Sequence, residues 1–563
     1  MPDPKKLLSK VFVLALRRLG VKWLRSAFLG FMGLSKRDFE QIIFDRWGVE
    51  GVASLEIRYF TSVGKAGEVF RPTDVRHWSL VDLGRLGKDP KLVWEPSRFE
   101  FLDDYVFGVK PDFEEGFRLI LLWHKLNPFD FGENWFSNME VAIRVLHLLR
   151  FREGAEGRLN AHQLDLLDHS IRLHEQHLKQ ELRSTKYSMG GNHYLIELCA
   201  LQCLASSNGD ASFDEALLNE IGSQFLADGG NFEGSVGYHI FTLDAVLFTI
   251  IRSKVAGVVI PDSVINKAKQ ALEFVVKISA FDLLPNIGDM DDGVITRLTY
   301  QSPMSVSKFL SHYTDVLEGI VSLDTKVLTD QFEVQKYFGL STYRGGSSGY
   351  DWTLWFRHGS IEHGHSHLDM LQVLIADIEG PWLLDSGTYQ YGVDNNLRNS
   401  FRCLEGHSTV SLAKFDYPKP FRPFMWSKKL PVHTKVSADS QSMEAGYGEY
   451  DEISVTRRVS VVGHTIVITD QIRSEFGFET RFLFAGVVEH GSDNCIVVKR
   501  PNCPAKLVLT HNLHDSVLSM RSRDVSSAYA CKFPATELLI SGAGNRSSTE
   551  VEFRIGFERT NRY

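Results

Sequence analysis

The chain contains little cysteine and no long apolar run. Its 563 residues include six cysteines, at positions 199, 203, 403, 495, 503 and 531, and no pair has the CxxC spacing. This pattern argues against a disulfide scaffold or a cysteine-based zinc finger, and Cys199 and Cys203 are interpreted as buried thiols of a helix. The longest uncharged apolar run near the N-terminus, residues 11–16, is too short for a membrane span of about 20 residues.

An excess of positive charge is also missing. The chain has 62 Lys and Arg residues and 70 Asp and Glu residues, which gives a formal net charge of −8. This balance argues against a nucleic-acid binder that works by neutralising phosphates. With 43% apolar and 23% charged residues, the chain is not globally disordered, and its length predicts two or more domains.

Two halves of the chain differ in their hydrophobic periodicity. From about residue 112 to 320, helical spacing of apolar residues predicts helices over 116–127, 137–152, 161–183, 192–206, 235–256 and 263–280. Such antiparallel helix pairs either close into a ring or stack as a solenoid. Beyond about residue 336, short alternating runs predict an antiparallel β-sandwich, with a hairpin turn at Gly463 and His464.

Histidines gather in the segment IEHGHSHLD, residues 361–369. On a strand or an extended loop alternate residues share a face, so His363, His365 and His367 are expected to point the same way. The His-x-His pattern favours a metal or catalytic role over a surface cluster.

Two later segments supply further candidate metal ligands. Asp385 follows an apolar strand and His407 leads into another, and two imidazoles with a carboxylate make an acceptable zinc ligand set. The alternative for Asp385 is an acid that begins the DSG turn.

Two loop-to-helix junctions carry further candidates. Asn192 and His193 begin an apolar helix. An ordinary N-cap is the favoured alternative for Asn192, and it would place His193 and Tyr194 in the first turn, where side chains and free N–H groups can face an anion. The segment DGGNFEGSVGYH places Glu233, Tyr238 and His239 at the second junction, where a tyrosine usually serves packing.

Taken in order, the segments NHYLIE, DGGNFEGSVGYH, GHSHLDMLQVLIADIEGPWLLDSGTYQYG and FRCLEGHSTV resemble the heparinase II/III-like polysaccharide lyases, and the likeness extends from about residue 85 to 412. The resemblance implies a multidomain α + β protein: a basic helical and extended segment over 1–95, an incomplete α/α toroid over 96–330 and an antiparallel β-sandwich over 331–563. The chain looks most like the members associated with bacterial exopolysaccharide or O-antigen gene clusters.

The activity implied by this resemblance is cleavage of a uronic-acid polysaccharide by β-elimination. The reaction needs neutralisation of the uronate carboxylate, removal of the C5 proton and protonation of the departing O4. By resemblance, Asn192 and His193 act on the carboxylate, while Tyr238 and His365 are the acid and base. The configuration at C5 decides which of the two removes the proton.

The resemblance also implies a zinc ion, held by His367, Asp385 and His407, with a structural role beside His365. Candidate ligands of the acidic polysaccharide are Arg98, Glu140, Arg144, Glu233, Arg398 and Arg402, with structural ion pairs as the competing explanation. The acids of GDMDDG, Asp289, Asp291 and Asp292, are left open between a loop cap, a metal site and sugar ligands.

Two other functions compete with a lyase: a non-catalytic glycan-binding protein of exopolysaccharide or O-antigen assembly, and a zinc-dependent glycan hydrolase. The presence of Asn192, Tyr238 and His365 together favours catalysis. The basic amphipathic N-terminus is interpreted as a helix that touches a membrane surface or packs on the protein. With no clear cleavable signal peptide, location is left open between the cytoplasm and the periplasm of a bacterium, as is oligomeric state.

Overall fold

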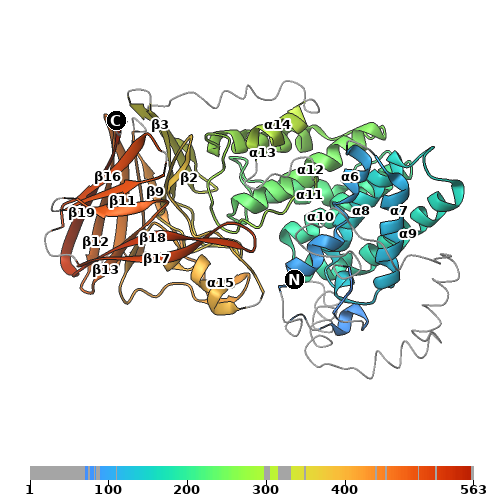
Figure 1. Cartoon of the computed structure of the whole chain (residues 1–563), viewed down its shortest axis with the longest axis horizontal. Coiled ribbons are helices and arrows are strands. Elements are labelled where there is room, and N and C mark those ends of the chain that lie inside the picture. Colours follow the sequence, from blue (N-terminus) through green and yellow to red (C-terminus); the bar gives the residue numbers. More distant parts are fainter. Residues whose placement is uncertain are drawn as a thin grey trace, which may run out of the picture. The chain divides into compact units, whose positions relative to one another are not determined.

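The structure is a computed structural model that describes residues 70–559, apart from residues 74–75, 82, 84–88, 109–110, 297–304, 315–330, 348–349, 393, 438–440, 450–452, 492–493, 502 and 514–516. The basic N-terminal helix predicted from the sequence lies outside the described residues. Helices come first along the chain and strands follow (Figure 1). The chain forms two compact units, one of Met1–Glu220, Asp244–Pro261 and Ile295–Leu298, the other of Ile221–Leu243, Asp262–Val294 and Thr299–Tyr563.

All six helices predicted from periodicity are present. The α-helices are α5 (Pro90–Trp94), α6 (Leu102–Phe107), α7 (Phe113–Leu126), α8 (Asn138–Gly154), α9 (Ala161–Ser188), α10 (Gly191–Ser207), α11 (Glu215–Gln224), α12 (Val236–Val255), α13 (Asp262–Ile278), α14 (Val306–Thr314) and α15 (Asn395–Arg402). Local signals set their starts: Asn160 and Gln163 form a capping box at α9. Helix α8 packs against α9 and α10, which explains why it is buried along most of its length.

Helix α12 is long and apolar enough to cross a membrane, but 83% of its most apolar window is buried inside the protein. A helix that is apolar on all sides lies either in a membrane or in the core of a protein. In the described part of the chain, α12 is therefore a core helix.

The strands form two large antiparallel sheets and a short hairpin. They are β1 (Glu333–Gln335), β2 (Leu340–Ser347), β3 (Tyr350–Arg357), β4 (Val373–Asp377), β5 (Gly380–Leu383), β6 (Val410–Leu412), β7 (Pro420–Arg422), β8 (Met425–Trp426), β9 (His433–Val436), β10 (Ser442–Glu449), β11 (Ile453–Val462), β12 (Thr465–Ser474), β13 (Phe478–Phe484), β14 (Val487–His490), β15 (Cys495–Lys499), β16 (Ala505–His511), β17 (Val517–Ala528), β18 (Cys531–Gly542) and β19 (Asn545–Arg559). The nine-stranded sheet has the order β1-β2-β3-β4-β5-β13-β18-β17, with β6 beside β13; the eight-stranded sheet has the order β14-β15-β16-β19-β12-β11-β10-β9.

The predicted hairpin at Gly463 and His464 is confirmed, since Val462 pairs with Thr465 across the turn. The coarse fold prediction, a helical region followed by an antiparallel β domain, is also confirmed. Closure of the helices into a toroid, the sandwich and the predicted boundaries at 95 and 330 stay predictions.

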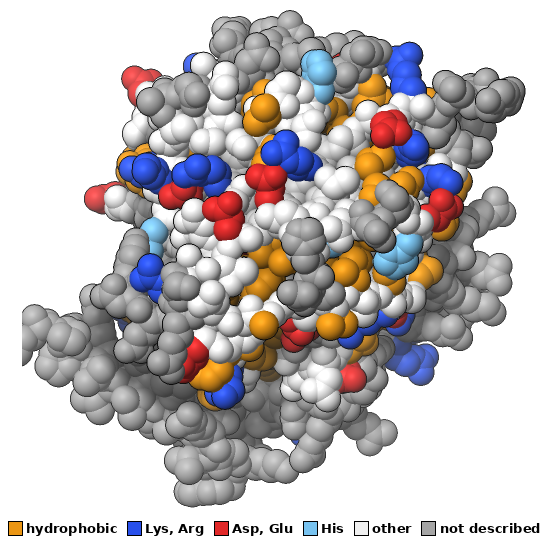
Figure 2. Space-filling model, turned by 90° about the vertical axis from the view of Figure 1, so that its left-hand side faces the viewer, with side chains coloured by type: hydrophobic (Ala, Val, Ile, Leu, Met, Phe, Trp, Pro, Cys, Tyr) orange, Lys and Arg blue, Asp and Glu red, His pale blue; other side chains and the backbone are white. Residues whose placement is uncertain are grey.

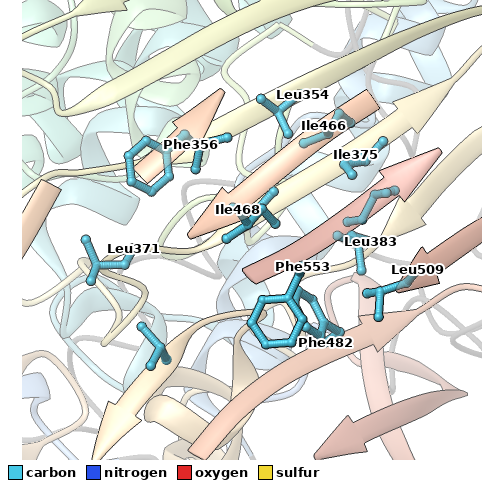
Figure 3. Close-up of a cluster of buried hydrophobic side chains, with 14 of the residues drawn as sticks. Leu354, Phe356, Leu371, Ile375, Leu383, Ile466, Ile468, Phe482, Leu509 and Phe553 are labelled. Carbon is cyan, nitrogen blue, oxygen red and sulfur yellow. The ribbon is translucent and has the colours of Figure 1, made fainter. Parts of the chain in front are cut away.

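Both sheets contribute to one buried apolar core. Leu354 and Phe482 come from the nine-stranded sheet, and Ile468, Leu509 and Phe553 come from the eight-stranded sheet. Figure 3 shows these side chains gathered together between the strands. The shared core gives the loops that leave the strand ends a rigid support, which precise placement of site residues requires.

Removal of the Phe482 ring is expected to lower the free energy of unfolding by about 3–5 kcal/mol, the usual cost of a Phe→Ala change in a core. Phe482 is 0% exposed, and its ring centroid lies 5.1 Å from that of Phe553. Urea denaturation of Phe482→Ala checks this, with Phe533→Ala as the control because Phe533 is 40% exposed. Equal losses in both variants would contradict the assignment of the core.

Candidate active site

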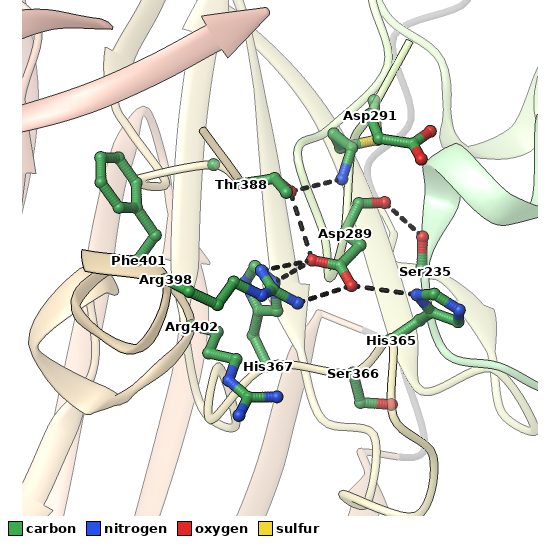
Figure 4. A network of polar contacts seen from close by, with 12 residues as sticks. Ser235, Asp289, Asp291, His365, Ser366, His367, Thr388, Arg398, Phe401 and Arg402 are labelled. Atoms are coloured by element: carbon green, nitrogen blue, oxygen red, sulfur yellow. Dashed lines mark hydrogen bonds and ion pairs between the residues drawn. The ribbon is translucent and has the colours of Figure 1, made fainter. Parts of the chain in front are cut away.

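A buried carboxylate, Asp289, is the centre of the site (Figure 4). Its Oδ2 lies 3.0 Å from Nδ1 of His365, and its Oδ1 lies 2.9 Å from Nε2 of His367. The Arg398 guanidinium forms an ion pair with Asp289 at 2.7 Å. Burial alone would raise the pKa of Asp289, but the Arg398 charge and the two imidazole hydrogen bonds hold it well below its usual range. Asp289 is therefore an anion that accepts from two histidines.

Backbone contacts fix Asp289 beside His365. The Asp289 N–H donates to the carbonyl oxygen of His365 at 2.9 Å. Gly288 has a φ of +64°, and a Cβ at this position would lie 2.7 Å from the same oxygen. Only glycine fits this conformation and this close approach without strain, so the GDMDDG segment packs tightly against the histidine segment.

Tyr238 lies in the first turn of α12, and its ring stacks on His365. The ring centroids are 3.6 Å apart, with 24° between the planes. Ser235 precedes the helix, and its Oγ accepts from the Tyr238 N–H at 3.0 Å, as an N-cap side chain does. The same Oγ donates to the Asp289 carbonyl at 2.5 Å, so the start of the helix and the GDMDDG segment are joined.

The Tyr238 hydroxyl lies among acidic and phenolic groups. It donates to Oδ2 of Asp291 at 3.1 Å and lies 3.4 Å from the Tyr391 hydroxyl. Burial raises the pKa of Tyr238 well above 10, and the charges of Asp291 and Asp289 raise it further. The phenol is therefore protonated at neutral pH, which suits a proton donor.

The three histidines of residues 361–369 have different surroundings, and the segment is a loop. His365 and His367 share the Asp289 carboxylate. His363 instead packs edge-on against Phe232, with ring centroids 4.7 Å apart. His239 is a core residue: its Nε2 lies 3.1 Å from the Ala271 carbonyl oxygen, and burial lowers its pKa to about 3.

The structure brings His367, Asp385 and His407 together. One ligand atom from each lies within 4.8 Å of the others, and all three residues are buried. Among the described residues, neither Nδ1 of His367 nor Nε2 of His407 has a hydrogen-bond partner. Nε2 of His367 lies 2.9 Å from Oδ1 of Asp289, while Nδ1 of His407 lies 2.8 Å from Oδ2 of Asp385, which is itself one of the three candidate ligands. Two imidazole nitrogens and a carboxylate fit a zinc ion, and carboxylate support of a ligating histidine is common at such sites.

Arg398 and Arg402 are only 2% and 1% exposed, and their described contacts are internal. Arg398 pairs with Asp289. Arg402 donates to the carbonyl oxygens of Pro423 at 2.6 Å and Arg422 at 2.7 Å. Both arginines lie on α15, which the sequence patterns did not indicate. Their predicted contact with substrate stays a prediction.

Arg98, Glu140 and Arg144 belong to the helical unit and are also buried. Arg98 forms a two-bond ion pair with Glu140, at 2.7 and 2.8 Å. The Arg144 guanidinium lies 4.7 and 5.3 Å from the ring centroids of Trp123 and Trp135, and burial lowers its pKa to about 9. These contacts lie within the helical unit, and contact of the three residues with substrate stays a prediction.

Helix α10 begins at Gly191 with Gly190 as its N-cap, so the N-cap alternative for Asn192 is wrong. Asn192 is buried in the first turn, and His193 follows it. Both belong to the helical unit, and their convergence with Tyr238 stays a prediction. Glu233 is 6% exposed, and its carbonyl oxygen accepts from the Ser366 hydroxyl at 3.2 Å.

Three neighbours of the site were not identified from the sequence. Tyr391 lies beside the Tyr238 hydroxyl, Thr388 lies 3.4 Å from Oδ1 of Asp289, and Phe424 packs on His365 with ring centroids 4.9 Å apart. The Thr-x-x-Tyr spacing after Asp385 was visible, but nothing in it separates these residues from ordinary turn and packing residues.

Two models of one protein family match the chain. The heparinase II/III N-terminus model matches residues 134–309, and the heparinase II/III-like C-terminal model matches residues 331–554. No curated protein sequence matches the chain.

Solved structures share the fold at low sequence identity. A heparinase III structure has a TM-score of 0.67 at 13% identity, covering 97% of this chain and 93% of that chain. Heparan sulfate lyase HepC from Pedobacter heparinus has a TM-score of 0.57 at 17% identity, covering 84% and 78%. The chondroitin AC lyase of Streptomyces coelicolor has a TM-score of 0.51 at 10% identity, covering 93% and 83%. Because the two family models together span most of the sequence, the chain belongs to the heparinase II/III-like family of polysaccharide lyases.

Proposed function

We propose that the protein cleaves a uronic-acid-containing glycan by β-elimination at Tyr238 and His365. The observation that carries the proposal is the stacked pair of these two side chains, 3.6 Å apart, held between the Asp289 and Asp291 carboxylates. The names of the similar structures, heparan sulfate lyase and chondroitin AC lyase, support an acidic polysaccharide as the substrate class.

In this reaction the base removes the C5 proton, the C4–O4 bond breaks, a double bond forms between C4 and C5, and O4 receives a proton. Tyr238 is the better acid, because its raised pKa keeps the phenolic proton in place until O4 develops charge. His365 is then the base. Its Nδ1 is hydrogen-bonded to Asp289, which leaves Nε2 as the nitrogen for the C5 proton, as in other Asp–His pairs.

Neutralisation of the uronate carboxylate is assigned to Asn192 and His193. An amide or imidazole donor aimed at the carboxylate would stabilise the enolate-like charge that grows as the C5 proton leaves. Burial of Asn192 in the first turn of α10 supports a fixed donor at a helix N-terminus, where an anion is favoured.

A zinc ion at His367, Asp385 and His407 has a structural role in this proposal. When bound, it would anchor the loop that carries His365, two residues from His367. The elimination itself needs no activated water, so the chemistry is assigned to the protein side chains.

His407→Ala is expected to reduce bound zinc from about one ion per chain to near zero, because it removes one of three protein ligands. Elemental analysis of the purified protein by mass spectrometry measures this. His358→Ala is the matched control, since His358 is also buried but lies outside the ligand cluster. Zinc retained in His407→Ala would remove this residue from the site.

The activity is tested by ultraviolet absorbance during incubation with heparan sulfate, chondroitin sulfate, alginate and bacterial exopolysaccharides. A rise from the conjugated C4–C5 double bond is the expected result. If the glycan is cleaved without a rise in absorbance, and a metal chelator abolishes that cleavage, the protein would instead be a zinc-dependent hydrolase. Binding without any cleavage would indicate a glycan-binding protein.

A further inference from the structure

A short hairpin of residues 419–429, formed by β7 and β8, exposes large apolar side chains. Phe421 is 66% exposed, Met425 46% and Phe424 38%. Exposed apolar groups are common singly, whereas several on one small element are a reason to look for a ligand there. We refer to residues 419–429 as the Phe421 hairpin.

The Phe421 hairpin lies directly beside the candidate catalytic pair. The Phe424 ring centroid is 4.9 Å from that of His365 and 4.8 Å from that of Tyr391. The backbones also approach closely, since a Cβ on Gly364 would lie 2.0 Å from the Phe424 carbonyl oxygen. Glycine between His363 and His365 therefore allows the hairpin to pack against the loop that carries His365.

Internal hydrogen bonds hold the hairpin in this position. The Trp426 indole N–H donates to the Ser366 carbonyl at 3.0 Å. Arg402 donates to the carbonyl oxygens of Pro423 and Arg422, and its guanidinium lies 4.6 Å from the Trp426 ring centroid. A binding element held in place before the ligand arrives loses little entropy on binding.

The hairpin carries four cations, and two of them pair with acids. Lys428 pairs with Asp416 at 2.6 Å, and Lys429 pairs with Glu362 at 3.1 Å. Lys419 and Arg422 are exposed; within the described part of the chain neither is within ion-pair distance of an acid, although the Lys419 charge helps to lower the pKa of Asp416. Arg422 instead lies over the ring of Phe421, 5.6 Å from its centroid.

Exposed cations of the eight-stranded sheet include two that pair with acids on neighbouring strands, Arg458 with Glu444 and Lys499 with Glu489, each at 2.7 Å. Figure 2 shows basic and acidic side chains interspersed on the face that it draws. An acidic polymer gains little from such alternating charge.

We propose that the Phe421 hairpin is a binding subsite for the acidic glycan, next to the sugar that reacts at Tyr238 and His365. Phe421 stacks against the apolar face of a sugar ring, and Arg422 and Lys419 bind its carboxylate or sulfate groups. An acidic sugar offers both an apolar ring face and negative charge, which matches the two kinds of side chain exposed here. The inference rests on the proposed function for the identity of the neighbouring reactive site.

Binding of the full-length protein to immobilised heparan sulfate, chondroitin sulfate and alginate tests the subsite without requiring cleavage. Phe421→Ala and Arg422→Ala are each expected to weaken binding to the retained polymer by about tenfold. The loss of affinity in Arg422→Ala should shrink at high salt, because salt screens the interaction between exposed charges, whereas the loss of affinity in Phe421→Ala should persist. Ile378→Ala and Arg458→Ala are controls, because both residues are exposed and lie on other turns and strands.

Where the wild type also cleaves the polymer, both hairpin variants should raise KM by a similar factor with kcat within about twofold. Retained affinity in both hairpin variants would overturn the subsite even if the protein is a lyase. Lost affinity in a protein that cleaves nothing would support the subsite and reject the lyase. Failure of the wild type to bind any of the three polymers would overturn the subsite.

Discussion

Tyr238→Phe is expected to reduce kcat for elimination by about 10³-fold, within the range usual for loss of a general acid. The substitution removes only the hydroxyl, which donates to Asp291 at 3.1 Å and lies 3.4 Å from the Tyr391 hydroxyl. The phenylalanine ring keeps the stacking contact with His365. Substrate binding should therefore persist while protonation of O4 is lost, so KM should change little.

Tyr447→Phe is the matched control for this experiment. Tyr447 is also buried, and its hydroxyl donates to the Val410 carbonyl at 3.0 Å, but it lies in β10 of the eight-stranded sheet. The rate of formation of the C4–C5 double bond is measured by ultraviolet absorbance for both variants. A Tyr238→Phe enzyme within tenfold of the wild type would sink the assignment of Tyr238 as the acid.

The architecture was predictable from the sequence because periodicity reports burial directly. Helix α8 and strand β3 are apolar in the pattern that their surroundings require. Helix α15 escaped prediction because its eight residues contain mostly polar side chains, two of which, Arg398 and Arg402, are buried through ion pairing and hydrogen bonds to carbonyl groups. Such burial leaves no apolar pattern in the sequence.

The candidate site was predictable as a set of residues but not as a set of contacts. Tyr238 and His365 are 127 positions apart and were grouped only through ordered motifs; the structure stacks their rings. The role of Asp289 could not be assigned, because nothing in GDMDDG distinguishes the acid that binds two histidines from its neighbour Asp292, whose carboxylate accepts from the Tyr529 N–H at 2.7 Å.

Asp289→Asn is expected to lower kcat by about 10²–10⁴-fold, since the paired carboxylate fixes the tautomer of the His365 imidazole, the proposed base. An amide presents one oxygen and one NH2 group where the carboxylate accepts from His365, His367 and Arg398. At least one of these three hydrogen-bond donors then faces the NH2 group of the asparagine, which also donates. Zinc affinity should also fall, by roughly 10–100-fold, because His367 loses the partner of its second nitrogen.

Stability should fall with activity, because Arg398 is left buried without a full counter-charge, which usually costs about 3–5 kcal/mol. Asp470→Asn separates the two effects: Asp470 forms an equally buried pair with Arg457, at 2.6 and 2.7 Å, without contacting His365 or His367. This control should lose comparable stability in urea and keep kcat within about threefold of the wild type, measured where both proteins are folded.

Asp292→Asn is a second control and should keep the kcat, the stability and the zinc content of the wild type. If Asp289→Asn matched Asp470→Asn in kcat and zinc affinity as well as in stability, Asp289 would be a structural ion-pair residue, and His365 and the proposed metal ligands would be held by other contacts.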